Sequence, residues 1–192
     1  MMDNPGQRTD STQPGDNTES LIRENIALLS ELLADLRTID DDLFASQSGQ
    51  FAAGQTVGRH CRHICDHYEA LLRSVAGATP CDVLSLDYDD RARCTETELN
   101  RDRCIARLED YKQHLRALSG VSGQQSVQLS ADVYVGGQGR TTMMSTLARE
   151  LGFLASHTTH HSALVAILLQ GLSVQPAPEL GRAAATRAHE SA

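Results

Sequence analysis

Apolar residues recur at three- and four-residue spacing in four separate stretches of the chain. This spacing is typical of amphipathic helices that bury one face. The predicted helices span residues 18–44, 56–75, 95–118 and 145–169. Four long helices joined with one long crossover favour an all-α fold, an up-down four-helix bundle.

The segment before the last predicted helix departs from this pattern. Residues 126–144 are richer in Val and Thr, and the run 127–135 alternates in part between apolar and polar side chains. The sequence Gly136-Gly137-Gln138-Gly139 interrupts the middle of the segment. We therefore expect a short β-hairpin or an extended flap before the last helix.

Neither end of the chain carries an apolar stripe. Residues 1–18 are polar and predict a disordered N-terminal tail. The sequence Gln175-Pro176-Ala177-Pro178 stops any helix, so residues 173–192 are predicted to form a flexible C-terminal tail. The bundle domain is accordingly predicted to span 19–172.

Composition narrows the class of protein. The chain has no Trp and only 4% aromatic residues, which predicts an aliphatic core and favours helices. A net charge of −8 argues against nucleic-acid and anionic-membrane partners. No apolar run reaches the roughly 18 residues of a membrane span, and the first residues lack the apolar region of a secretory signal. Five cysteines, an odd number, favour reduced thiols in the cytoplasm.

Six of the eight histidines fall in two clusters, one on the second predicted helix and one on the fourth: His60, His63 and His67, and His157, His160 and His161. Two histidines four residues apart on a helix, as His157 and His161 are, can bind one metal ion. A third imidazole from a facing helix would leave open positions for water or substrate. Helical angles alone favour His60 over His63 for that role, since His60 lies nearer the apolar stripe. Helix-surface or core-edge histidines are the alternative interpretation.

Three stretches carry a family resemblance: TVGRHCRHICDHYEALL (56–72), LDYDDRARCTETELNRD (86–102) and RELGFLASHTTHHSALVAILLQGL (149–172). The first and third resemble the second and fourth helices of the DinB/YfiT superfamily. There a metal-binding His follows a Ser or Thr by seven residues, which maps from Thr56 to His63, and the HxxxH pair maps onto His157 and His161. The middle stretch looks like the Tyr-Asp-x-Arg-x-Arg element of one branch. The resemblance covers about 20–172.

The resemblance implies a bundle of DinB/YfiT type with one divalent metal ion, zinc, nickel, iron or manganese, on His63, His157 and His161. Superfamily members are described as metal-dependent hydrolases, transferases of small thiols such as bacillithiol or mycothiol, isomerases, or modules fused to iron enzymes. We therefore expect a hydrolase or a small-thiol transferase acting on a small molecule. The alternative is a non-catalytic, stress-related metal-binding module. A homodimer is also implied by the resemblance alone.

Side chains near the predicted ligands have more than one interpretation each. His60 is an alternative ligand, a hydrogen-bond donor to a ligand, or a core-edge residue. His67, one turn after His63, orients that ring or binds substrate. Asp66 accepts a hydrogen bond from a ligand histidine, or is a solvated helix charge.

Glu150 lies two turns before His157 on the same helix face and is the candidate general base. Its alternative role is a salt bridge to Arg62 or Arg149. Arg91 and Arg93 form a structural ion-pair network, or they bind an anionic substrate. Cys61 and Cys65 are read as small buried hydrophobic residues.

Overall fold

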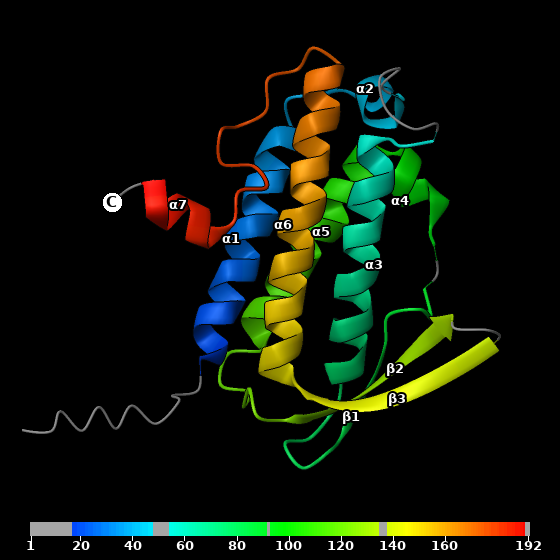
Figure 1. Cartoon of the computed structure of the whole chain (residues 1–192), viewed down its shortest axis with the longest axis vertical. Helices are drawn as coiled ribbons and strands as arrows, with labels where there is room; N and C mark the ends of the chain where they lie inside the picture. The colour runs from blue at the N-terminus through cyan, green and yellow to red at the C-terminus, as the bar shows by residue number, and fades with distance from the viewer. Residues whose placement is uncertain (1–16, 48–53, 92, 135–137, 191–192) are drawn as a thin grey trace, which may run out of the picture.

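The computed structural model describes residues 17–47, 54–91, 93–134 and 138–190. The predicted N-terminal tail therefore lies outside the described residues, except for its last two positions. The described chain is helix-rich and carries one small three-stranded sheet (Figure 1). The helix-rich prediction is confirmed, whereas the chain is not purely helical and the up-down bundle topology stays a prediction.

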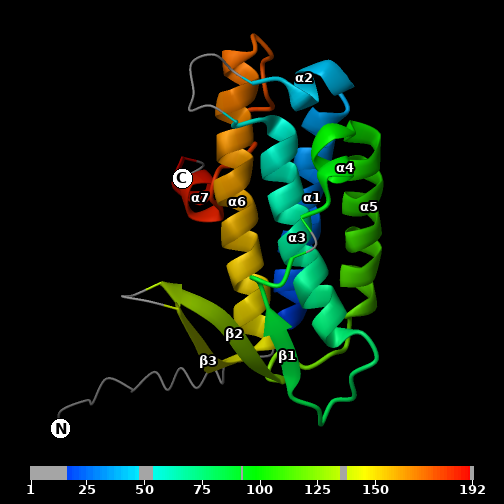
Figure 2. The same ribbon diagram turned by 90° about the vertical axis from the view of Figure 1, so that its right-hand side faces the viewer.

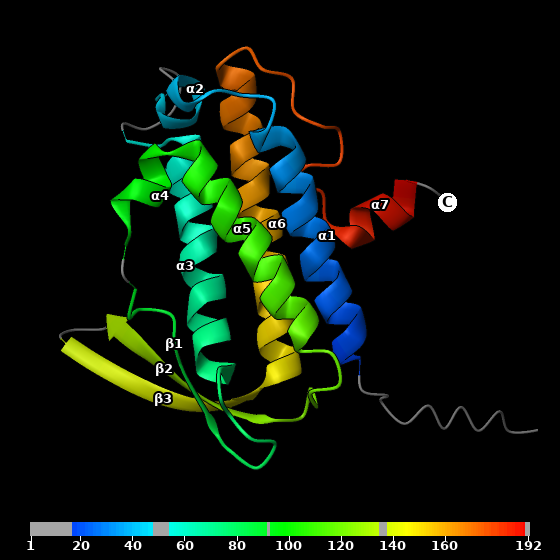
Figure 3. The same cartoon turned by 180° about the vertical axis from the view of Figure 1, so that it is seen from behind.

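Four long helices form the body of the fold: α1 (Thr18–Leu36), α3 (Val57–Val75), α5 (Arg101–Ala117) and α6 (Leu147–Gly171). Helices α1 and α3 each pack against both α5 and α6, as seen from two sides in Figures 1 and 3. Their apolar stripes meet in a mostly aliphatic core, and Cys61 and Cys65 are fully buried there.

Two of the predicted helices are interrupted. The first ends at Leu36 and is followed by the short helix α2 (Asp41–Ala45), whose N-terminal amide on Leu43 is capped by the Asp40 carboxylate. The third is divided at Asn100 into α4 (Thr95–Leu99) and α5. Asn100 has an extended backbone, and its side chain accepts a hydrogen bond from the Arg103 amide, so it caps a new helix rather than continuing the old one.

The two histidine-bearing helices begin at threonine caps. The Thr56 hydroxyl accepts the Arg59 amide at the start of α3, and the Thr146 hydroxyl accepts the Arg149 amide at the start of α6. Each cap satisfies one of the amides that has no partner within the first helical turn.

The sheet has the strand order β1-β2-β3, with β1 at Leu84–Asp87, β2 at Ser126–Tyr134 and β3 at Gln138–Thr146. Strands β2 and β3 are antiparallel, so the predicted hairpin is present and is longer than expected. The sequence did not reveal β1, which pairs in parallel with β2. The sheet crosses the end of the helices where α3 ends and α6 begins (Figures 1 and 2).

A buried polar network joins α1, α3 and α6. The Tyr68 hydroxyl donates to Asn25 Oδ1 at 2.7 Å and accepts from the Thr158 hydroxyl at 3.1 Å. The Asn25 amide donates to the carbonyls of Leu21 and Leu151. Buried polar groups need hydrogen-bond partners, and these groups reach their partners only when the helices are aligned as they are here. The network therefore defines the register of α3 against α6.

The sequence predicts a flexible segment after α6, from residue 173. In the structure, Leu180 is buried and the Ala177 amide donates to the Asp35 carboxylate on α1. The short helix α7 (Ala184–Glu190) places Arg187 against Glu31 with two hydrogen bonds of 2.7 Å. The flexibility of this segment stays a prediction. No helix in the described ranges has the length and apolarity to cross a membrane.

Candidate metal centre

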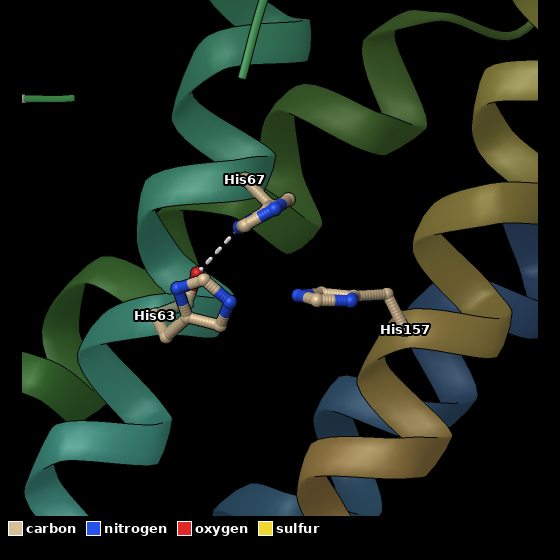
Figure 4. Close-up of side chains that lie close together, drawn as sticks. All are labelled: His63, His67 and His157. Carbon is tan, nitrogen blue, oxygen red and sulfur yellow. Dashed lines mark hydrogen bonds between the residues drawn. The ribbon is translucent and has the colours of Figure 1, made fainter. Parts of the chain in front are cut away.

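Helices α3 and α6 bring three histidines together. One ring nitrogen from each of His63, His67 and His157 lies within 4.8 Å of the others. In Figure 4 the rings of His63 and His157 point toward one another from the two helices, and His67 lies one turn further along α3. The four-residue spacing places His63 and His67 on the same face of α3, and packing against α6 supplies the third imidazole.

His161 lies beside this trio. Its ring centroid is 4.6 Å from that of His63 and 4.5 Å from that of His157. Its Nδ1 is 2.9 Å from Nδ1 of His60, so one of these two nitrogens donates a hydrogen bond to the other. Thus the three predicted ligands, His63, His157 and His161, lie side by side. The ring-nitrogen distances, however, group His67 rather than His161 with His63 and His157.

The hydrogen bonds constrain the tautomers of the α3 histidines. Nδ1 of His67 is 2.9 Å from the carbonyl oxygen of His63, and since a carbonyl only accepts, His67 donates and keeps a free lone pair on Nε2. The guanidinium of Arg91 donates to Nδ1 of His63 at 2.9 Å. The proton of neutral His63 therefore lies on Nε2, and an ion could bind Nδ1 only by displacing Arg91 from it.

The imidazoles are neutral at physiological pH. Burial, followed by the neighbouring His67, lowers the pKa of His63 to about 2 and that of His157 to about 3. Burial and then His60 lower the pKa of His161 to about 4. Nε2 of His157 is buried and has no hydrogen-bond partner among the described residues. Neutral, clustered imidazoles with an unpaired buried nitrogen fit the donor set of a divalent transition metal.

An aromatic wall covers the cluster on the side of the sheet. The Tyr88 ring stacks on His67 with centroids 5.1 Å apart, and Phe153 stacks on His157 at 5.4 Å. Phe153 lies four residues before His157, so helical spacing already placed the two side by side. Tyr88 comes from the segment after β1, in the stretch that resembles the Tyr-Asp-x-Arg-x-Arg element, and no residue spacing indicated its contact with His67.

Glu150 does not contact the histidines through hydrogen bonds. Its side chain is fully buried and accepts from the Tyr88 hydroxyl at 3.0 Å, from Arg149 at 2.8 Å and from Ser145. The structure therefore shows the salt bridge that was the alternative to a general base, with Arg149 as the partner. Through Tyr88 this carboxylate braces the ring that stacks on His67.

Asp66 has a similar outcome. Its buried carboxylate accepts from Arg62 at 2.6 Å, and Arg62 also binds Glu98 at 2.7 Å. No hydrogen bond joins Asp66 to a histidine in the described part of the chain. Asp66 is thus neither solvated nor a partner of a candidate ligand there.

A cavity of about 440 Å³ opens beside the cluster. It is lined by Gln55, Arg59, His60, Arg62, His63, Arg91, Arg93 and His161. The structure therefore brings both predicted loop arginines to the histidines, and His63 is shared by the cluster and the cavity wall. The cavity gives a small molecule access to the imidazoles of His60, His63 and His161.

Comparison with known families agrees with this architecture. The model of the DinB family matches residues 15–184, so the chain belongs to the DinB family. No curated protein matched the sequence. The helix-rich fold and the three-histidine cluster that can hold a metal ion thus define a DinB-like, metal-associated protein.

Proposed function

We propose that this protein is a divalent-metal-dependent enzyme that acts on a small molecule in the cavity beside its histidine cluster. The observation that supports this most directly is the position of three neutral imidazoles within 4.8 Å of one another, one of which, His63, also lines that cavity. A structural site closes its ion off with four protein ligands, whereas a catalytic site keeps a position open.

The proposed reaction is hydrolysis or the transfer of a small thiol. A divalent ion supplies Lewis-acid chemistry and lowers the pKa of a water or thiol bound to it. The chain's own residues would hold and orient this centre. Tyr88 and Phe153 stack on His67 and His157 and orient these two rings, whereas Arg91 would move away from Nδ1 of His63 when an ion binds there.

Both the motif and the nitrogen distances favour His63 and His157 as ligands, and we propose that the third ligand is one of two neighbours. The family motif favours His161, and the nitrogen distances favour His67. His67 donates from Nδ1 and so carries its lone pair on Nε2, and His161 does the same when it is the donor in its hydrogen bond with His60. Zinc, nickel, iron and manganese are all compatible with this donor set.

A non-catalytic metal-binding role is the second candidate. It is favoured by the state of Glu150, whose carboxylate is occupied by three donors and therefore does not offer a ready general base. Turnover of any ester, amide or thiol-transfer substrate that depends on the metal would contradict this alternative.

Metal analysis tests the proposal. Tag-free protein would be loaded with zinc, nickel, manganese or iron(II), desalted and measured by mass spectrometry, beside His157→Ala, His67→Ala and His161→Ala. We expect about one ion per chain in the wild type and loss of the ion in His157→Ala. His114→Ala, an exposed histidine on α5, is the matched control. A wild type that takes up none of the four metals would refute the proposal.

The two single variants also identify the third ligand. If His161 binds the ion, His161→Ala loses metal and His67→Ala retains it, and the opposite pattern assigns His67. Metal bound only to the folded chain should also raise the melting temperature of the wild type but not that of His157→Ala.

Location and assembly stay predictions. We propose a cytoplasmic protein with reduced thiols and no nucleic-acid or membrane partner, on the basis of composition. A homodimer is proposed from the family resemblance, and light scattering after size-exclusion chromatography would measure it directly.

A further inference from the structure

The cavity beside the histidines has an unusual concentration of positive charge. Four of its eight lining residues are arginines, and none is acidic. The chain as a whole carries a net charge of −8. The cavity is thus a locally cationic site on an acidic protein.

Only one of these arginines is neutralised by carboxylates in the described structure. Arg62 binds both Asp66 and Glu98. Arg59 donates instead to the carbonyl oxygen of Gly54 at 3.0 Å, and Arg91 donates to a ring nitrogen of His63. Neither of these acceptors brings a negative charge.

Arg91 and Arg93 also have charge and hydrogen-bond donors that no carboxylate satisfies in the described structure. Arg93 forms no salt bridge within the described ranges, and the buried Nε of Arg91 has no hydrogen-bond partner there. Asp66 exerts some longer-range attraction on Arg91, but Arg62 already holds that carboxylate. Most other arginines of the described chain do pair with a carboxylate, as at Arg37, Arg73, Arg101, Arg103, Arg107, Arg140, Arg149, Arg182 and Arg187.

The backbone at Arg93 supports a functional constraint. Arg93 has a φ of 47°, in the left-handed region that residues with a Cβ disfavour. An outlier of this kind persists only when the surroundings hold it, and such outliers gather at ligand sites. Here the residue with the unusual backbone conformation also lines the cavity.

We propose that Arg59, Arg91 and Arg93 form an oxyanion site that binds the carboxylate or phosphate group of a small acidic substrate. A guanidinium presents a planar set of donors that matches both anions and stays charged at all physiological pH values. The inference deepens the proposed function, on which it rests, because an anion held on these arginines would present the rest of the molecule to His63 and His161. The volume of about 440 Å³ suits a small molecule.

Calorimetric titration with two probes tests the site. Succinate and inorganic phosphate would be titrated separately into metal-free protein at neutral pH and low salt, and succinate also into zinc-loaded protein. The test variant is Arg59→Gln/Arg93→Gln. The matched control is Arg23→Gln/Arg116→Gln, which removes the same charge from exposed positions on α1 and α5.

We expect one or both anions to bind the wild type and the control alike, with affinity at least about tenfold weaker in the test variant, since each charge-assisted bond contributes on this scale. Whichever anion binds assigns the substrate group as a carboxylate or a phosphate. Circular dichroism and metal content of the same samples would show that the test variant is folded and still loads zinc.

Two results would overturn the inference. One is a wild type that binds neither anion, and the other is equal binding by the wild type and the folded test variant. If the protein loads metal in either case, the metalloenzyme proposal stands without the oxyanion site. If the anion binds as expected but no metal loads, the cavity is confirmed and the metalloenzyme proposal fails.

Discussion

Replacement of Tyr68 by phenylalanine probes the contact that aligns the two histidine-bearing helices. The Tyr68 hydroxyl is fully buried and links Asn25 of α1 to Thr158 of α6, the residue next to His157. The substitution removes one oxygen and leaves the ring and the core volume unchanged. Any loss of stability therefore reports on the hydrogen bonds alone.

The size of the effect follows from what is left behind. Asn25 Oδ1 and the Thr158 hydroxyl both lose their partner, and both residues are almost completely buried. A buried polar group left unsatisfied costs about 1–3 kcal/mol, and removal of the tyrosine hydroxyl itself recovers part of that cost. We expect a loss of about 2–3 kcal/mol in the free energy of unfolding, which corresponds to a melting temperature lower by about 4–12 °C.

Tyr111→Phe is the matched control. Tyr111 is also a buried tyrosine, and its hydroxyl accepts hydrogen bonds from Arg107. Arg107 keeps Glu69 and Thr97 as partners when that hydroxyl is removed. Loss of this hydroxyl strands no buried group, so we expect less than about 1 kcal/mol.

Urea denaturation followed by circular dichroism measures both variants. A lower midpoint with an unchanged m-value would indicate a change in stability alone. Equal stability of Tyr68→Phe and Tyr111→Phe would refute the reasoning, because the Asn25 and Thr158 groups would then have found other partners at no cost.

Two further predictions concern the C-terminal segment and its contact with α1. Gly181 has a φ of 74°, and a Cβ there would lie 2.2 Å from the backbone nitrogen of Ala163, so Gly181→Ala should destabilise the fold by at least about 2 kcal/mol. Gly77 has the same φ with open space around it, so Gly77→Ala isolates the backbone penalty, and equal urea midpoints for the two variants would contradict the steric argument. Burial raises the pKa of Asp35 above its unfolded value near 4, so the ionised carboxylate lowers the stability of the folded protein once pH rises through the folded pKa. The unfolding free energy of the wild type should therefore fall relative to that of Asp35→Asn between acidic and neutral pH. A constant difference between the two proteins across that range would argue against this prediction.

Much of the helical structure was predictable because each long helix carries its own evidence. The apolar stripes of α1, α3, α5 and α6 recur within the helix that they define, and threonines mark the starts of α3 and α6. The breaks were not predictable in the same way. Asn100 caps α5 only because the chain turns there, and periodicity continues through it.

The sheet was predictable in part for a related reason. Strands β2 and β3 are neighbours in sequence, so partial alternation around a glycine-rich centre indicated their hairpin. Strand β1 has only four residues and pairs with Val127 and its neighbours far along the chain. A pattern of four residues carries little information, and non-local pairing leaves no periodic signal.

At the candidate metal centre, the sequence indicated the histidines but not their arrangement. Four-residue spacing placed His157 with His161 and His63 with His67, whichever way the helices packed. Helical angles favoured His60, because they measure distance from an apolar stripe and contain no information about the facing helix. The family resemblance selected His63, which the structure places at the centre of the cluster.

The sequence by itself thus determined the helix-rich class, the acidic balance, the hairpin and the two sets of imidazoles, all of which depend on local periodicity or composition. Tertiary packing decided which histidines face one another, the engagement of Glu150 by Tyr88 and Arg149, and the gathering of four arginines around one cavity. These contacts join residues from separate elements. Their geometry depends on how far each helix is rotated and shifted against its neighbours, and a one-dimensional pattern does not contain that information.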